Sequence, residues 1–349
     1  MSDMPAAVDA LSVPQPQFSE AVAHRTLAQD FGLEGELTPL VSERDQNFRL
    51  TTADGRRFVF KIANSSESKE TTDLQIKVLL HIESRHCPVN TPILCRTLSG
   101  HESSEIIAGD MAHVCRVVSY VPGTLLSDVD RSPTLAESFG QSAARLDLAL
   151  QDFSHPADSQ TLLWDLQRAG ELRALLTHVQ EPELLAAVSR CLDDFEQIVE
   201  PALPSLRRQV IHADLNPDNV LADSDDHEKV AGVIDFGDMT RAPLVVEVAV
   251  AAAYLRVDAV DALAFVQPFV AGFHGILPLQ REELGLLFDL IRIRLAATIT
   301  ILRWRAATRG HDDDYSRQFL QSERSAEVFL ARIDAMGRSA FSNGLYALS

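Results

Sequence analysis

The spacing of hydrophobic residues divides the chain into a strand-rich first third and a helical remainder. Alternating apolar positions predict short strands at Leu37–Val41, Asn47–Thr52, Arg57–Ile62, Ile93–Leu98, Ser104–Ile107 and His113–Tyr120. Apolar residues recurring on one helical face predict helices at Phe18–Phe31 and Ser68–Ser84. From Leu135 onward the pattern is helical, apart from β-like runs at Gln209–Ile211, Val220–Leu221 and Val230–Ile234. We therefore expect an α+β fold with two unequal lobes.

Composition narrows the class of partners. The chain has 349 residues, with 31 Lys plus Arg against 50 Asp plus Glu, which gives a formal charge of −19. Without a concentrated basic stretch, such a protein lacks the main source of affinity for nucleic acid. An acidic surface suits a small cationic molecule instead. The four cysteines form no CxxC pair, so they predict neither a zinc site nor a disulfide framework, and they fit the cytoplasm.

Two kinds of segment bear on targeting. Residues 1–17 are small and polar and lack the basic and apolar regions of a signal peptide, so we interpret them as a loose tail. The apolar segments Leu244–Leu255 and Leu284–Trp304 contain charged residues that a lone membrane helix rarely carries. We expect core helices there and no membrane partner.

The residues with the strongest chemical signal lie between 210 and 238. His212-Ala213-Asp214 is followed by Asn219, and Ile234-Asp235-Phe236-Gly237-Asp238 comes 21 residues after Asp214. Two β-like runs thus each deliver an Asp at their carboxyl end. Transfer of a γ-phosphoryl group needs a carboxylate for the attacking hydroxyl and hard oxygen ligands for Mg²⁺. Asp214 is the predicted base, and Asn219 and Asp235 are the predicted metal ligands.

Less specific explanations apply to each of these residues alone. An Asp-Phe-Gly triplet occurs in buried turns for backbone reasons, and His212 is interpreted as a structural brace for the loop. The two motifs together, at this spacing, favour a catalytic site over coincidence.

The combination of HxDxxxxN and IDxxD resembles the aminoglycoside phosphotransferases and the choline/ethanolamine kinases. Within that superfamily the chain is most similar to hydroxylysine kinase and its bacterial relatives, on the segments Asp45–Phe48, Phe58–Ile62, Ile234–Asp238 and Ala242–Ala249. The resemblance implies a two-lobed protein-kinase-like fold. Its nucleotide-binding lobe would span residues 18–118, and its catalytic and acceptor-binding lobe residues 119–349.

The resemblance also implies nucleotide contacts. Lys61 matches the lysine that contacts the α- and β-phosphates, although a solvated strand lysine is the alternative. Its usual glutamate partner is replaced by Gln75 at the aligned position, with Asp73 and Glu70 as other candidates. The loop before Asn47 contains no glycine, so backbone N–H groups and short polar side chains would meet the phosphates there.

The remaining implied contacts concern the nucleotide base, the acceptor and the metal loop. The Ser119 carbonyl and the Val121 N–H are predicted to meet the edge of the base. Trp164 and Asp165 are candidates for the acceptor's ammonium group, although Asp165 could equally begin a helix. Arg294 could hold a substrate carboxylate or form a structural ion pair with Asp289, Glu247 or another acid. Glu247 and Asp238 are interpreted as supports of the metal loop.

We therefore expect a Mg²⁺-dependent kinase that transfers the γ-phosphoryl group of GTP or ATP to an amino alcohol or hydroxy amino acid, first of all 5-hydroxylysine. Homoserine, choline, ethanolamine and aminoglycosides remain as alternative acceptors. A catalytically dead nucleotide-binding pseudokinase is the alternative of another class, and the oligomeric state stays open.

Overall fold

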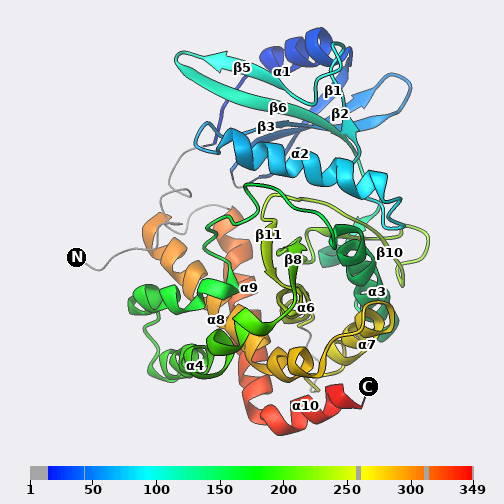
Figure 1. The fold of residues 1–349 in the computed structure, drawn as a ribbon. Helices are drawn as coiled ribbons and strands as arrows, with labels where there is room; N and C mark the ends of the chain where they lie inside the picture. The colour runs from blue at the N-terminus through cyan, green and yellow to red at the C-terminus, as the bar shows by residue number, and fades with distance from the viewer. Residues whose placement is uncertain (1–14, 43, 257–260, 310–313, 348–349) are drawn as a thin grey trace.

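A computed structural model describes residues 15–42, 44–256, 261–309 and 314–347. Figure 1 shows an antiparallel sheet with two helices at one end of the molecule and a larger, mainly helical part at the other. The predicted α+β class and the two unequal parts are confirmed. The predicted loose tail lies outside the described residues up to residue 14, and residues 15–17 form neither helix nor strand.

The N-terminal sheet has six strands in the order β1-β2-β3-β6-β4, with β5 also paired to β6. Asn47 on β2 lies opposite Lys61 on β3, and Lys61 lies opposite Arg116 on β6, so the three residues form a row across the sheet. The strands are β1 (Gly35–Leu40), β2 (Gln46–Thr52), β3 (Arg57–Ile62), β4 (Leu94–Cys95), β5 (Ser104–Ala108) and β6 (Met111–Ser119).

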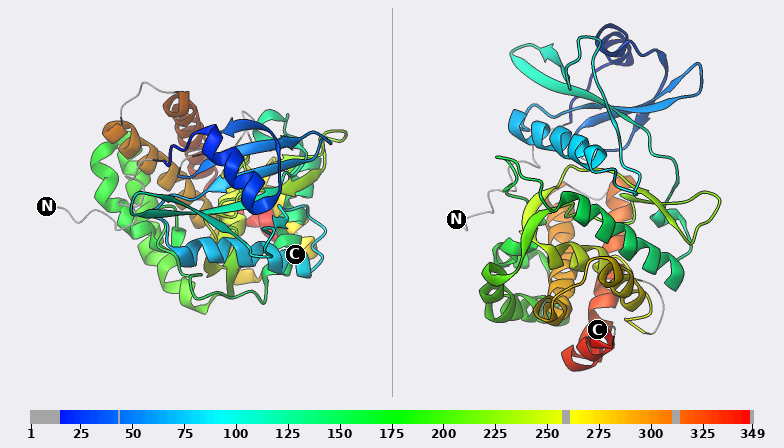
Figure 2. Two further views of the ribbon diagram at one scale, coloured as in Figure 1. Left: turned by 90° about the horizontal axis from the view of Figure 1, so that it is seen from above. Right: turned by 45° about the vertical axis from the view of Figure 1, so that its right-hand side comes forward.

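One helix covers each face of this sheet. α1 (Glu20–Thr26) continues into the π-helical turn η2 (Leu27–Phe31), and its Leu27 and Phe31 pack with the strand side chains in one apolar cluster. α2 (Lys69–Ser84) begins at Ser68, whose hydroxyl accepts a hydrogen bond from the Thr71 N–H, as a helix N-cap does. Figure 2 shows α2 between the sheet and the helical part. Its buried side chains belong to the large apolar core of that part.

The C-terminal part contains two small antiparallel sheets, β10-β9-β7 and β11-β8, surrounded by helices. Its strands are β7 (Thr124–Leu125), β8 (Arg208–Ile211), β9 (Val220–Ala222), β10 (Val230–Val233) and β11 (Thr240–Pro243). Its α-helices are α3 (Pro133–Leu150), α4 (Pro182–Asp194), α5 (Glu200–Ala202), α6 (Leu244–Ala253), α7 (Val266–Ile276), α8 (Arg281–Arg309), α9 (Asp314–Met336) and α10 (Arg338–Tyr346). The remaining helical segments are the 3₁₀ segments η3 (Leu126–Asp128), η4 (Leu166–His178) and η6 (Leu203–Ser205) and the π-helical segment η5 (Phe195–Val199).

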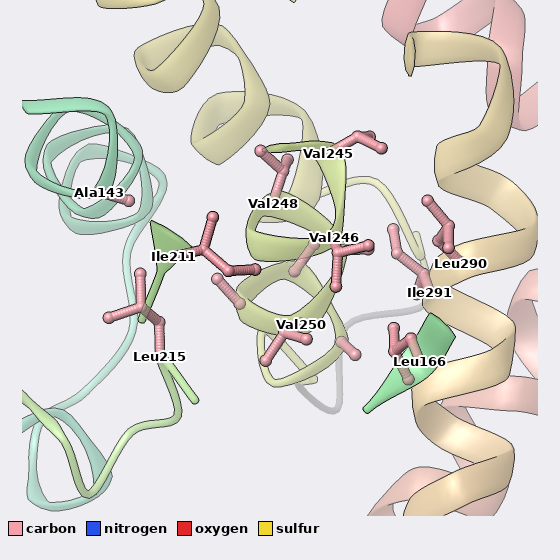
Figure 3. Close-up of a cluster of buried hydrophobic side chains, with 14 of the residues drawn as sticks. Ala143, Leu166, Ile211, Leu215, Val245, Val246, Val248, Val250, Leu290 and Ile291 are labelled. Atoms are coloured by element: carbon pink, nitrogen blue, oxygen red, sulfur yellow. The ribbon is translucent and has the colours of Figure 1, made fainter. Parts of the chain in front are cut away.

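The apolar core lies directly beneath the segment that carries the chemical motifs. Figure 3 shows Ile211 and Leu215 beside the valines of α6, with Leu290 and Ile291 of α8 on the opposite side of that helix. Ile211 and Leu215 are fully buried. Because they flank residues 212–214 on both sides, core packing holds the two ends of this loop in place.

Most predicted elements are present with small shifts at their ends. The run predicted at Ile93–Leu98 pairs only at Leu94–Cys95, and the short strands β7 and β11 were not predicted, because strands of two to four residues carry too little periodicity to detect. The two apolar segments form α6 and part of α8. No helix in the described ranges is long and apolar enough to span a lipid bilayer.

Candidate active site

The candidate site forms where the loops after β8 and β10 meet. The Asp214 carboxylate accepts hydrogen bonds from the side-chain amides of Asn216 and Asn219, both at 2.9 Å to Oδ2. Its other oxygen, Oδ1, lies 3.2 Å from Nη2 of Arg294. With only 23% of its side chain exposed, Asp214 is held on both oxygens and its direction is defined by its neighbours.

The backbone of this loop is held by a buried glutamate. Glu247 on α6 is fully buried, and its carboxylate accepts the N–H of His212 at 3.0 Å and the N–H of Ala213 at 2.8 Å. Ala213 has a φ of 64°, a left-handed conformation that a non-glycine residue adopts only when its surroundings impose it. Glu247 is therefore placed to impose the strained turn that presents Asp214.

His212 links the two motifs. Its Nε2 lies 3.0 Å from the Ile234 carbonyl oxygen, and its Nδ1 accepts the Asp214 N–H at 3.3 Å. In these contacts Nε2 is the donor to the carbonyl oxygen and Nδ1 is the acceptor. Nε2 thus joins the loop after β8 to the residue that follows β10, and Nδ1 braces the loop itself.

Burial and charge act in opposite directions on Asp214. Burial raises the pKa of Asp214 to about 6, while the nearby Arg294 guanidinium opposes this rise, and the charges of Asp238 and Asp235 add to it. A carboxylate with a pKa close to the working pH is a better proton acceptor than an ordinary exposed aspartate.

Arg294 on α8 is 2% exposed and lies among aromatic rings. Its Nη1 donates to the Trp164 carbonyl oxygen at 3.2 Å, its Nη2 lies 3.1 Å from the Tyr254 hydroxyl, and its Cζ stands 4.9 Å from the Trp164 ring centroid. Of the two alternatives for Arg294, the structure shows an ion pair with an acid. That acid is Asp214, whereas Asp289 pairs with Arg338 and Glu247 binds backbone amides.

Asn219 and Asp235 lie on the other side of Asp214. The Asn219 side-chain NH₂ donates to both the carbonyl and the carboxylate of Asp214, so its carbonyl oxygen is the atom left for a cation. Asp235 has a φ of 59° and a half-exposed side chain. Nζ of Lys61 lies 3.7 Å from its Oδ1, and this positive charge lowers the pKa of Asp235.

These oxygens fit a hard divalent cation. In the described part of the chain, no three His, Cys, Asp or Glu side chains are placed so that they could hold a metal ion by themselves. Mg²⁺ does not need three such side chains, because it is commonly held by one or two carboxylates together with the phosphates of a substrate. One carboxylate and one amide oxygen beside a lysine match that arrangement.

The partner of Lys61 differs from the expectation. Lys61 forms its ion pair with Asp235, while Gln75 accepts from Nη2 of Arg116 and donates to Glu67 at 3.4 Å. The amide of Gln75 is neutral and lies beside the buried Arg116, which is the nearer cation across the sheet. A kinase-like lysine pair with α2 is therefore absent from the described contacts, and Asp73 pairs with Lys77 and His155 instead.

The remaining predicted nucleotide residues lie in β2, at the end of β6 and just after β6. Ser119 is the last residue of β6, where its N–H donates to the Ile93 carbonyl and its hydroxyl accepts the Ile93 N–H. Val121 lies two residues after Ser119 and is buried. Asn47 is 9% exposed and its Oδ1 lacks a hydrogen-bond partner in the described structure. Base and phosphate contacts by these residues stay predictions.

Asp165 and Trp164, the two candidates for the acceptor's ammonium group, make different contacts in the structure. Asp165 is the N-cap of η4, and its Oδ1 accepts the Gln167 N–H at 2.9 Å, which is the helix-start alternative. Trp164 lies against Arg294 and also 5.4 Å from Cζ of Arg305. The ring therefore contacts cations of the protein itself.

Sequence reasoning missed several residues of this site. Arg44 pairs with Asp238, Tyr254 contacts Arg294, and Arg256 stacks on Tyr254 at 4.8 Å. None of them stands in a recognisable motif. Only Arg256 carried a weak signal, because it directly follows the apolar segment Leu244–Leu255 and charged residues in such places are usually paired or functional.

Comparisons with known proteins agree with this geometry. A hydroxylysine kinase of Danio rerio is 25% identical over 335 residues, covering 93% of this chain and 94% of the relative. A homoserine kinase of Methylobacillus glycogenes is 28% identical over 243 residues, covering 68% of this chain and 69% of the relative. A solved amicoumacin kinase in complex with AMP-PNP and Ca²⁺ has a TM-score of 0.66 at 15% identity, covering 89% of this chain and 94% of that one.

The likeness to the solved structure shows the protein-kinase-like fold. The sequence profile of the phosphotransferase enzyme family matches residues 36–284, which contain Lys61, Asp214, Asn219 and Asp235. The chain therefore belongs to the phosphotransferase enzyme family and is a small-molecule kinase.

Proposed function

We propose that this kinase phosphorylates the hydroxyl group of a hydroxy amino acid, with 5-hydroxylysine as the first candidate and GTP or ATP as the donor. The observation that carries the proposal is a group of three arginines: Arg294 and Arg256 are buried and Arg131 is half-buried, and Arg294 lies against Asp214. The similarity to hydroxylysine kinases over nearly the whole chain supports it.

The proposed reaction uses the residues around Asp214. The acceptor oxygen bonds to the γ-phosphorus, the bond from that phosphorus to the β–γ bridging oxygen breaks, and the hydroxyl proton passes to Asp214. Asn216 and Asn219 orient the carboxylate, and Arg294 compensates its charge before the proton arrives. Mg²⁺, held by Asn219 and Asp235, would neutralise charge on the phosphates.

Three arginines, Arg294, Arg256 and Arg131, contact Tyr254. Arg256 is 7% exposed, donates to the Ser322 carbonyl and stacks on Tyr254, and Arg131 donates to the carbonyls of Tyr254 and Arg256. Within the described contacts, neither of these two guanidinium groups pairs with a carboxylate, and burial lowers the pKa of Arg256 to about 10.

Among the described residues, Asp214 is the one carboxylate that forms an ion pair with any of these three arginines. Buried cations that outnumber their acids favour an anionic ligand group. A carboxylate bound there would bring the hydroxyl end of an amino acid toward Asp214. Choline and aminoglycosides lack a carboxylate and would be repelled. Homoserine has a carboxylate, and the similarity to a homoserine kinase makes homoserine the second candidate acceptor.

A coupled kinase assay tests the acceptor. The panel is 5-hydroxylysine, its α-carboxamide, homoserine, ethanolamine, choline and kanamycin, each with GTP and with ATP. Hydroxylysine should be preferred, and its carboxamide should have a KM higher by about 10-fold or more, since a charged hydrogen bond contributes roughly 1.5–3 kcal/mol. Preference for choline or kanamycin would reject the proposal.

Arg256→Gln tests where the substrate carboxylate binds. Arg256 does not contact Asp214 in the described structure, so the substitution should not disturb the proposed catalytic base directly. It should raise the KM for hydroxylysine and leave that for the carboxamide nearly unchanged. An equal effect on both acceptors would show that Arg256 does not meet the carboxylate.

A further inference from the structure

Arg44 lies between β1 and β2 and pairs with Asp238 beside the predicted metal ligand Asp235, and the sequence around it has no glycine with which to surround a phosphate. Residues 42–47 of this segment read Ser-Glu-Arg-Asp-Gln-Asn. A kinase normally brings several backbone N–H groups of a glycine-rich loop to the phosphates. Another group of this segment must therefore replace those backbone N–H groups.

Arg44 reaches from this segment across to the opposite part of the molecule. Its Nη2 lies 2.5 Å from Oδ1 of Asp238, which follows the metal loop. A Cβ built on Gly237 would lie 3.4 Å from Nη2 of Arg44 and 3.1 Å from Oδ1 of Asp235. The Arg44 guanidinium and the Asp235 carboxylate therefore both stand over Gly237, beside the place where a metal-bound phosphate would lie.

Arg44 is positioned differently from an ordinary surface arginine. Its side chain is 35% exposed, and that of Asp238 is 20% exposed, so the pair is partly shielded from water. The surrounding carboxylates of Asp238, Glu67 and Asp235 all favour its charged form. The site thus has two cations from the N-terminal part, Lys61 and Arg44, each paired with one acid of the segment Asp235–Asp238.

We propose that Arg44 binds the terminal phosphate of the donor nucleotide, and that Asp238 holds it in position before the nucleotide arrives. A planar guanidinium can contact two phosphate oxygens, which makes one arginine an adequate replacement for glycine-loop amides. Lys61, which lies deeper in the sheet, then serves the phosphates nearer the nucleoside. The proposal rests on the kinase activity and does not depend on the acceptor.

Calorimetric titration without any acceptor tests this assignment. Arg44→Ala and Arg44→Lys are titrated with the Mg²⁺ complexes of a non-hydrolysable nucleoside triphosphate and of the matching diphosphate. Arg44→Ala should bind the triphosphate about 10- to 100-fold more weakly, as expected for loss of a charged hydrogen bond. Its affinity for the diphosphate should change less than about twofold, and Arg44→Lys should lose less than Arg44→Ala.

The control is Arg56→Ala, which removes another arginine of the same part of the chain. Arg56 is 63% exposed and pairs with Asp54 in the turn between β2 and β3. The Arg56→Ala variant should bind both the triphosphate and the diphosphate with the parent's affinity. Equal losses for triphosphate and diphosphate in Arg44→Ala would mean that Arg44 only ties the two parts together, and unchanged affinities would remove it from the site. Either result would overturn the proposal.

Discussion

Glu247 offers a direct test of how the catalytic loop is held. Its two oxygens accept the N–H groups of His212 and Ala213, and its side chain is fully buried. Glu247→Ala leaves both amides without a partner in a site where water has little access. An unsatisfied buried polar group costs about 1–3 kcal/mol, so the two together should lower the free energy of unfolding by roughly 2–6 kcal/mol. That is a large share of the ~5–15 kcal/mol typical of a domain.

Glu247→Gln is the graded variant, because its remaining carbonyl oxygen can accept one of the two N–H groups. It should lose about half as much stability. Its kcat should fall by roughly 100-fold, since small displacements of a catalytic group are costly. Urea denaturation followed by tryptophan fluorescence gives the stability, and a coupled assay gives kcat.

An exposed glutamate elsewhere in the chain provides the control for Glu247. Glu228→Ala removes an exposed glutamate near the turn between β9 and β10 and should leave both measurements unchanged. If the free energy of unfolding of Glu247→Ala lies within about 1 kcal/mol of the parent's value, the two backbone amides find other hydrogen-bond partners. The proposed support of the Ala213 conformation would then be wrong.

Three further predictions concern single carboxylates. Asp214→Asn should lower kcat by about 10²–10⁴-fold or more while calorimetry shows nearly unchanged nucleotide affinity, because a general base acts on the transition state. Asp235→Ala should lose Mg²⁺-dependent nucleotide binding in the same titration, and unchanged binding would reject its role as a metal ligand. Asp147 is fully buried, neither carboxylate oxygen has a hydrogen-bond partner in the described structure, and burial raises its pKa well above the ordinary value. Because the folded state binds this proton more tightly, the stability contribution is present at low pH and is lost as pH rises through the raised pKa. The parent should therefore lose stability relative to Asp147→Asn across that window in urea denaturation, and parallel pH profiles would contradict this.

The elements that carry the catalytic motifs could be predicted because their signals are local. β8 and β10 are short, buried and bounded by polar turns, and the positions of Asp214 and Asp235 after them follow from the sequence alone. Asp235 comes 21 positions after Asp214, and the segment between them contains an antiparallel hairpin, β9–β10, for which the spacing leaves room. Convergence of the two loops is thus a consequence of chain connectivity.

The pairing of charged residues could not be predicted in the same way. Lys61 could have met Gln75, Asp73 or Glu70 on α2, and the choice depends on the position of Arg116 one strand away. Sequence spacing gives the face of a helix, but it does not show which of two neighbouring cations an amide will reach. The outcome required the relative placement of β6 and α2.

Arg294 shows the same limit over a longer distance. It lies 80 residues from Asp214, on a helix whose apolar character predicted only burial. A buried guanidinium needs acceptors, so an ion pair was a reasonable expectation, but no local pattern names the acid. Asp214 is that acid because α8 crosses behind Trp164 and brings the arginine to the catalytic loop. We propose that Arg294 acts on proton transfer through this contact, so Arg294→Ala should alter kcat for every acceptor in the coupled assay, whereas Arg256→Gln tests the substrate carboxylate separately.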